Sequence, residues 1–177
     1  MLNELVIAGF GGQGAMLMGQ LLSYAGMYEG KSVSWIPSYG PEMRGGTANC
    51  SVVLSSGEIG SPLVNEPNVL IVLNRPSLDK FESTVKPGGT IIYNSSMIDR
   101  VPNRPDVKII AIPANEIARE IGSDKVANMV LLGACLKATG CVSKDTLIDV
   151  LKKKMSEKAQ ALLPLNKAAI ERGMELV

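Results

Sequence analysis

The stretch that decides the fold is Glu4-Leu-Val-Ile-Ala-Gly-Phe-Gly-Gly-Gln-Gly14. Its first half, Glu4 to Gly9, is a short apolar run that predicts a buried strand, and Gly9 to Gly14 satisfies the pattern G-x-G-x-x-G. The segment from 14 to 28 that follows has helical length. A strand, a glycine-rich turn and a helix in this order predict the opening unit of an α/β fold.

The remaining chain predicts five more strands and several helices. Strands are predicted for the apolar or alternating segments 32–36, 47–55, 69–73, 90–94 and 107–112. Helices are predicted from 74 to about 85 and, three or four of them, after 113. This alternation predicts a three-layer α/β/α fold with a mostly parallel (mixed), Rossmann-like sheet and a helical C-terminal part. Because 47–55 alternates apolar and polar residues, it is the expected antiparallel strand.

The first predicted helix is apolar on nearly all sides. Ala15, Gly19, Leu22 and Gly26 form a stripe of mostly small side chains, which predicts a close approach of this helix to the sheet. The opposite side of the helix is also largely apolar. The sequence allows two interpretations of that side: a partner subunit covers it, or other helices of the same domain do.

The length and composition of the chain limit the classes of function that are expected. A chain of 177 residues fits one domain, in which residues 1–113 form the sheet and residues 114–177 are mainly helical. Lys plus Arg (18) nearly balance Asp plus Glu (17), and no apolar run approaches the roughly 20 residues of a membrane helix, so neither nucleic acid nor a membrane is expected as a partner. No secretion signal is recognised, and a cytoplasmic location is expected.

Metal, redox and imidazole chemistry are not expected of this chain. It contains no histidine, and its three cysteines, Cys50, Cys135 and Cys141, form no C-x-x-C pair. Structural zinc and Fe–S clusters need clustered thiolates or imidazoles, and most general acid/base catalysis uses histidine. We interpret the cysteines as small buried apolar residues and predict no catalytic residue and no metal ligand.

The first glycine-rich loop, 9–14, supplies the first candidate site residues. Glycines allow a tight turn and close approach of a ligand to the backbone, and the amides at a helix start suit an anionic group. The candidate residues here are Gly9, Gly11, Gly12, Gln13 and Gly14. A dinucleotide site also needs an acid at the end of the second strand, which here ends in Trp35-Ile36-Pro37. A stand-alone NAD- or FAD-binding oxidoreductase therefore remains only an alternative, as does a purely structural role for the glycines.

The second loop, Pro37-Ser-Tyr-Gly-Pro-Glu-Met-Arg-Gly-Gly46, supplies the rest. In a doubly wound sheet it leaves the same edge as the first loop. A guanidinium suits phosphate or carboxylate, and paired glycines leave room for a ligand. An ion pair between Arg44 and Glu42 is the plain alternative. The candidate residues are Ser38, Glu42, Arg44, Gly45 and Gly46.

Three elements in order, 9–14, Ser38-Tyr-Gly-Pro-Glu-Met-Arg-Gly-Gly-Thr47 and Leu73-Asn-Arg-Pro76, resemble the gamma subunit of 2-oxoacid:ferredoxin oxidoreductases and the equivalent domain of single-chain pyruvate enzymes. The resemblance covers essentially the whole chain. It implies a CoA-dependent oxidative decarboxylation of a 2-oxoacid to an acyl-CoA and CO2, with reduction of ferredoxin. It also implies that thiamine diphosphate, Mg²⁺ and Fe–S clusters are held by partner subunits.

The same resemblance implies the role of this chain in the complex. It would pack on thiamine-binding alpha and beta subunits, beside a possible ferredoxin-like delta subunit, and help to form the CoA side of the site. The amides of 11–14 would form a polar cradle, Arg44 would contact an anion, and Glu42 would orient a ligand or contact a partner. A purely architectural subunit is the second alternative. The tyrosine in Ser38-Tyr39-Gly40 favours a 2-oxoglutarate or branched-chain substrate.

Overall fold

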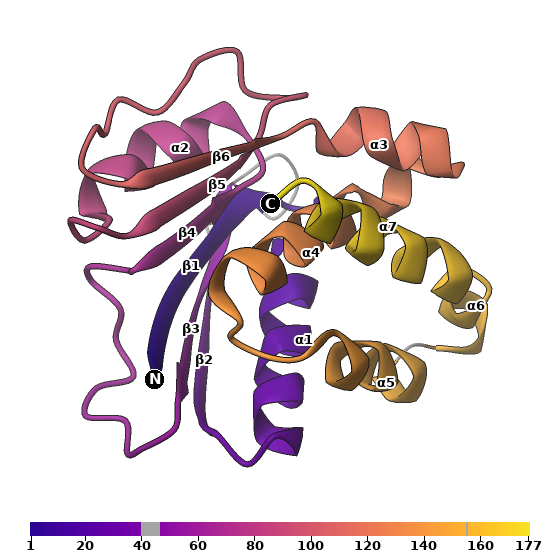
Figure 1. Ribbon diagram of the computed structural model, residues 1–177, viewed down its shortest axis with the longest axis horizontal. Coiled ribbons are helices and arrows are strands. Elements are labelled where there is room, and N and C mark those ends of the chain that lie inside the picture. Colours follow the sequence, from indigo (N-terminus) through magenta and orange to yellow (C-terminus); the bar gives the residue numbers. More distant parts are fainter. Residues whose placement is uncertain (40–46, 155) are drawn as a thin grey trace.

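One mixed sheet organises the molecule. The computed structural model describes residues 1–39, 47–154 and 156–177, and within them six strands form the sheet of Figure 1. β3 is antiparallel to both of its neighbours, whereas β1, β4, β5 and β6 are parallel, as predicted. The strands in spatial order are β2 (Ser32–Tyr39), β3 (Thr47–Ser55), β1 (Leu2–Phe10), β4 (Val69–Val72), β5 (Thr90–Asn94) and β6 (Lys108–Ile112).

Helices cover both faces of the sheet, which confirms the three-layer prediction. α1 (Ala15–Tyr28) and α4 (Ala127–Thr139) lie on one face, and α2 (Arg75–Phe81) lies on the other (Figure 1). Side chains alternate between two apolar clusters along β1, because successive residues of a strand point to opposite faces. Leu5 and Ile7 belong to the cluster under α1, and Val6 and Ala8 to the cluster under α2.

The second strand is longer than predicted. We expected a loop from Pro37 onward, but β2 continues to Tyr39, which is paired with Ala48 of β3. β2 is the edge strand of the sheet and is hydrogen-bonded on one side, to β3. A proline is tolerated in an edge strand because its missing donor can face away from the ladder. The prediction was wrong because it took Pro37 as the end of the strand.

The helical region after Ile112 begins with α3 (Ala114–Ile121) and the 3-10 turn η2 (Asp124–Val126), and the next helix is α4. Three further helices follow, α5 (Lys144–Lys154), the single-turn α6 (Glu157–Gln160) and α7 (Leu163–Glu175). α4 crosses α7 very closely. A Cβ atom added to Gly173 would lie 1.9 Å from the carbonyl oxygen of Val130, and one added to Gly133 would lie 2.0 Å from that of Ile170.

Two glycines bring α1 close to the sheet, as its small-residue stripe predicts. A Cβ atom on Gly19 would lie 2.5 Å from Cys50 Sγ, and one on Gly26 would lie 2.6 Å from Leu54 Cδ2. α4 and α5 contact other sides of α1, so helices of the same domain cover much of it. Leu17 and Met27 nevertheless remain exposed.

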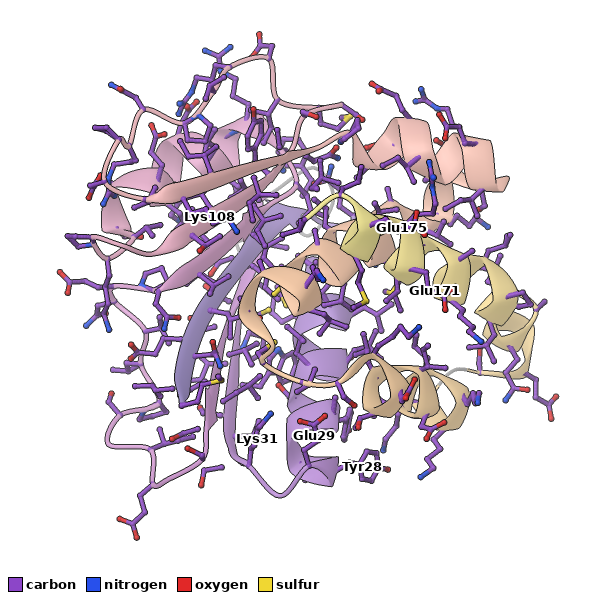
Figure 2. The ribbon with its side chains drawn as sticks, viewed as in Figure 1. Tyr28, Glu29, Lys31, Lys108, Glu171 and Glu175 are labelled. Carbon is purple, nitrogen blue, oxygen red and sulfur yellow. The ribbon has the colours of Figure 1, made fainter. Side chains whose placement is uncertain are left out.

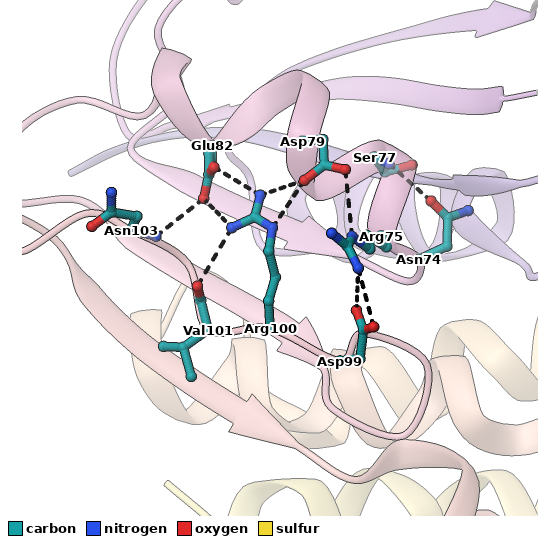
Figure 3. A network of polar contacts seen from close by, with 9 residues as sticks. All are labelled: Asn74, Arg75, Ser77, Asp79, Glu82, Asp99, Arg100, Val101 and Asn103. Atoms are coloured by element: carbon teal, nitrogen blue, oxygen red, sulfur yellow. Dashed lines mark hydrogen bonds and ion pairs between the residues drawn. The ribbon is translucent and has the colours of Figure 1, made fainter.

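Ion pairs fasten two segments to the fold. Figure 2 shows Glu29 and Lys31 together at the end of α1, where the carboxylate accepts hydrogen bonds from Lys31 Nζ at 2.7 Å and from the Ser143 amide at 2.6 Å. In Figure 3 the guanidinium of Arg100 binds Asp79 and Glu82, which holds the segment after β5 on α2 and η1 (Glu82–Thr84). Among the described residues, no helix is both long and apolar enough to cross a membrane.

Candidate functional site

A polar cleft opens at the carboxyl edge of the parallel strands. In open α/β sheets this edge is where ligands bind. The cleft has a volume of about 190 Å³ and lies between the first glycine-rich loop and the helical region. Its lining is Gly12, Gln13, Leu73, Asn94, Asn115, Asp124, Lys125, Ala127, Asn128 and Leu131.

The glycine-rich loop adopts a conformation that requires two of its glycines. Gly12 and Gly14 have φ angles of 91° and 86°, in the left-handed region that L side chains rarely enter. Gly14 is also the N-cap of α1. None of the amides of Gly11, Gly12 and Gly14 has a hydrogen-bond partner within the described part of the chain. The loop therefore offers free donors at the positive end of a 14-residue helix.

Gln13 fixes this loop to the neighbouring strand and helix. Its Oε1 atom accepts a hydrogen bond from the Phe10 amide at 2.7 Å and another from Asn74 Nδ2 at 3.1 Å. Asn74 Oδ1 in turn caps α2 by accepting from the Ser77 amide at 2.9 Å. The carboxamide oxygen of Gln13 is thus engaged inside the protein, and we assign it a positioning role.

Asn94, at the end of β5, shapes the opposite wall. Its Oδ1 atom accepts from the amides of Ser96 and Ala114, both at 3.2 Å, and its Nδ2 atom donates to Asn115 Oδ1 at 2.7 Å. These bonds hold the turn after β5 and the start of α3 in place. Asn115 is thereby presented at the wall of the cleft.

Asn128 carries the buried polar atom that points most directly to a ligand. It lies in the first turn of α4 and is 7% exposed. The side-chain nitrogen of Asn128 packs against the loop, since a Cβ atom on Gly14 would lie 2.3 Å from Asn128 Nδ2. Its Oδ1 atom is buried and accepts no hydrogen bond from any described residue. A buried acceptor without a donor costs about 1–3 kcal/mol, so this atom suits a ligand N–H or O–H group.

The charge of the cleft is concentrated in η2. Lys125 contributes an ammonium group, whereas the carboxylate of Asp124 is already bound by Arg119 Nε at 3.0 Å. Carboxamides, free loop amides and one lysine are groups that suit a polar ligand with an anionic group. No cluster of three potential metal-ligating side chains occurs among the described residues.

The predicted site residues separate into three groups. Gly12 and Gln13 line the cleft, and Gly9, Gly11 and Gly14 complete the loop behind them. Ser38 is exposed on the edge strand β2 and does not line the cleft. Glu42, Arg44, Gly45 and Gly46 lie outside the described residues.

The flanks of the two loops leave the same edge of the sheet. Phe10, the last residue of β1, is paired with Thr47, the first residue of β3. Tyr39, the last residue of β2, is paired with Ala48 of β3. The expected proximity of the two loops therefore holds for the residues on either side of the second loop. β3 nevertheless lies between β1 and β2, so the end of β2 is two strand spacings, about 10 Å, from β1.

This insertion weakens the dinucleotide alternative. A dinucleotide site needs an acid at the end of a second strand adjacent to the first. Here β3 occupies that adjacent position. Glu29, the acid nearest before β2, is bound by Lys31 and by the Ser143 amide.

Sequence reasoning missed the carboxamide walls of the cleft. Asn94 ends a strand that was predicted correctly, and a polar side chain at the carboxyl end of a parallel strand was the available signal. Asn128 interrupts the start of an apolar helical run and could have been questioned on that ground. Lys125 carried no signal, because a single surface lysine is ordinary.

Relatives of known identity match nearly all of this chain. It is 40% identical over 171 residues to ketoisovalerate oxidoreductase subunit VorA of Methanothermobacter marburgensis, covering 96% of this chain and 35% of the relative. It is 35% identical over 184 residues to 2-oxoglutarate synthase subunit KorC of Methanocaldococcus jannaschii, covering 99% and 94%. The chain thus spans about a third of VorA and nearly the whole of KorC.

Solved structures and a family model agree with these relatives. The crystal structure of a keto/oxoacid ferredoxin oxidoreductase gamma subunit from Geobacter sulfurreducens matches with a TM-score of 0.86 and 30% identity, covering 99% of this chain and 96% of that one. A 2-oxoglutarate:ferredoxin oxidoreductase from Magnetococcus marinus, with 2-oxoglutarate, coenzyme A and succinyl-CoA bound, matches with a TM-score of 0.89 and 27% identity, covering 99% and 31%. The family model for pyruvate ferredoxin/flavodoxin oxidoreductases matches residues 4–176. The chain therefore belongs to the pyruvate ferredoxin/flavodoxin oxidoreductase family.

Proposed function

We propose that this chain is the gamma-type component of a CoA-dependent 2-oxoacid:ferredoxin oxidoreductase and is inactive alone. In that reaction the 2-oxoacid loses CO2, its acyl carbon bonds to the CoA sulfur, and one proton and two electrons are released, the electrons going to ferredoxin. The observation that carries the proposal is the cleft, which offers binding groups at the carboxyl edge of the sheet in a member of this family.

The residues of this chain suit binding better than electron transfer. Cys50, Cys135 and Cys141 are all buried, and burial raises the pKa of the Cys50 thiol to about 11. The hydrogen bond from Cys135 instead lowers the pKa of the Cys141 thiol to about 7, but all three thiols are enclosed by the fold, which does not suit a cluster site. As the family resemblance implies, thiamine diphosphate, Mg²⁺ and the Fe–S clusters are assigned to alpha, beta and ferredoxin-like delta subunits. A cytoplasmic location, expected from the sequence, stays part of the proposal.

We assign this chain a contact with coenzyme A. The amides of Gly11, Gly12 and Gly14, together with Lys125, would hold a phosphate group, and Asn128 Oδ1 would accept from a donor on the ligand. Arg44 is retained as a second anion contact and Glu42 as an orienting or intersubunit residue. The Magnetococcus marinus relative, whose structure holds CoA, supports this assignment by analogy. The 2-oxoacid is proposed to be 2-oxoglutarate or a branched-chain acid, in line with KorC and VorA.

Steady-state kinetics of the purified complex test the CoA contact. Lys125→Ala and Arg44→Ala should each raise the KM for CoA about five- to tenfold, as loss of one charged hydrogen bond would, and leave the KM for the 2-oxoacid unchanged. Lys108→Ala is the matched control. Lys108 is an exposed lysine at the start of β6, at the opposite edge of the sheet from the cleft (Figure 2).

The alternatives make different predictions. If the chain is purely architectural, all three variants will assemble and show the wild-type KM for CoA. If it is a stand-alone dinucleotide oxidoreductase, the isolated chain will bind NAD(H) or FAD saturably in a titration. Either result would replace the proposed CoA contact.

A further inference from the structure

An apolar stripe of α1 remains exposed after the fold is complete. Leu17, Tyr24, Met27 and Tyr28 are exposed large hydrophobic residues at spacings of seven, three and one, which places them along one side of the helix. The side chain of Met27 is 60% exposed. Scattered apolar side chains are normal on a surface, whereas a contiguous stripe marks an interaction site.

The stripe borders a groove between α1 and the edge strand β2. The groove has a volume of about 260 Å³, and it is lined by Gln20, Ser23, Tyr24, Met27, Val33 and Trp35. None of these lining residues is charged. The groove is therefore suited to an apolar side chain rather than to a charged ligand.

Lysines of α5 form the rim of this groove. Lys153 Nζ lies 4.7 Å from the centre of the Tyr28 ring, and Lys154 Nζ lies 4.0 Å from that of Tyr24. Neither lysine has a carboxylate partner among the described residues, whereas the adjacent Lys152 is paired with Asp149 at 3.4 Å. Within the part of the chain that the structure describes, the rim thus carries two positive charges without a carboxylate partner, beside a largely apolar floor.

This charge decides between two kinds of occupant. A second copy of this chain, docked with the two-fold axis at this groove, would bring its own Lys153 and Lys154 close to those of the first copy. Like charges facing each other across an interface are strongly unfavourable. A partner that carries carboxylates would instead form ion pairs with both lysines, while its apolar residue fills the groove.

We infer that the α1–β2 groove receives an apolar segment, flanked by aspartate or glutamate, of another subunit of the complex. This inference rests on the proposed function, because it takes the partner to be one of the thiamine- or cluster-binding chains. Apolar side chains between Tyr24, Met27 and Trp35 would provide the buried anchor. Carboxylates at Lys153 and Lys154 would fix the orientation of the segment.

Site-specific photo-crosslinking in the purified complex tests this docking. A benzophenone amino acid is placed at Met27 and, as the matched control, at Met97, which is 49% exposed in the segment after β5 on the α2 side of the sheet. We expect position 27 to crosslink to an acidic, apolar segment of another subunit and position 97 not to do so. Combining Lys153→Glu with Lys154→Glu should lower the yield about tenfold, whereas Lys108→Glu should not change it.

Three results would overturn the inference. They are a crosslink from position 27 to a second copy of this chain, a crosslink to a basic segment, and no crosslink at all in an intact complex. CoA-dependent dye reduction by the same sample separates the two proposals. An active complex without the expected crosslink refutes the docking surface alone, whereas a chain that purifies without thiamine-binding partners and without activity refutes both.

Discussion

Gly14 meets two separate demands at the start of α1. Its φ of 86° is unfavourable for any residue with a side chain, and its Cα faces Asn128, whose Nδ2 atom would lie 2.3 Å from an added Cβ. Gly30 also has a positive φ, 72°, but nothing lies within 4 Å of its Cβ position. Comparing an alanine substitution at Gly30 with one at Gly14 therefore distinguishes the cost of backbone strain from the cost of a steric clash.

We predict that Gly30→Ala costs about 1 kcal/mol of stability through strain alone. Gly14→Ala should cost about 1–3 kcal/mol more, because Asn128 must also move. Urea unfolding of the two variants and the wild type measures both effects. Equal losses would show that the contact between Gly14 and Asn128 does not constrain the loop.

Glu29 gives the molecule a pH-dependent contact. Burial opposes ionisation, but hydrogen bonds from Lys31 and from the Ser143 amide outweigh it and lower the pKa of Glu29 from its ordinary value. A carboxyl group with a lowered pKa stabilises the folded state at pH values above its unfolded pKa, and this stabilisation is lost as the pH falls through the folded pKa.

Glu29→Gln should therefore cost about 1 kcal/mol at pH 7, and the difference from wild type should shrink as the pH falls below about 4.5. Urea unfolding of both proteins across pH 3 to 7 measures this difference. Glu58→Gln is the control, because Glu58 is exposed and makes no ion pair within the described chain. A difference that stays constant with pH would contradict the assignment.

At the scale of elements, the tightest contact is the crossing of α4 and α7. Gly133 and Gly173 each face a backbone carbonyl of the other helix, at about 2 Å from the position of an added Cβ. A backbone carbonyl cannot rotate away as a flexible side chain can. The two helices must therefore separate if either glycine gains a side chain.

Gly173→Ala is predicted to lower the free energy of unfolding by about 2–4 kcal/mol, even though alanine is the better helix former. Gly60→Ala, in a loop with open space at its Cβ position, should change stability by less than about 0.5 kcal/mol. Thermal or urea unfolding compares the two. A Gly173→Ala protein as stable as wild type would rule out the close crossing.

Elements with a strong local pattern were predictable. The strands 47–55 and 90–94 appear with the predicted bounds, and the glycine stripe of α1 packs on the sheet as expected. The extension of β2 through Pro37 was not predictable, because it depends on that strand being an edge. The crossing through Gly133 and Gly173 was missed because a glycine within a helix indicates by itself only lower helix propensity.

The candidate site was half predictable for the same reason. The glycine-rich loop is contiguous in the sequence, and its position between a strand and a helix is a local feature. The carboxamides of Asn94, Asn115 and Asn128 come from three distant segments, and the fold alone places them around one cleft. No local pattern records such an arrangement.

At the scale of the whole molecule, the described residues form two surfaces that are candidates for binding. A polar cleft lies at the carboxyl edge of the sheet, and an apolar groove with a basic rim lies along α1 and β2. The chain corresponds to about a third of VorA and of the Magnetococcus marinus chain, so the same fold also forms a section of longer chains. The proposed division of labour between this module and catalytic partners would account for both facts.

The most direct test of this account is affinity purification of the tagged chain from its native organism. The eluate is analysed for co-purifying chains and assayed for CoA-dependent dye reduction with a panel of 2-oxoacids. We predict that thiamine-binding and cluster-carrying chains co-elute and that one 2-oxoacid supports activity only when CoA is present. A chain that elutes alone and without activity would contradict the central claim.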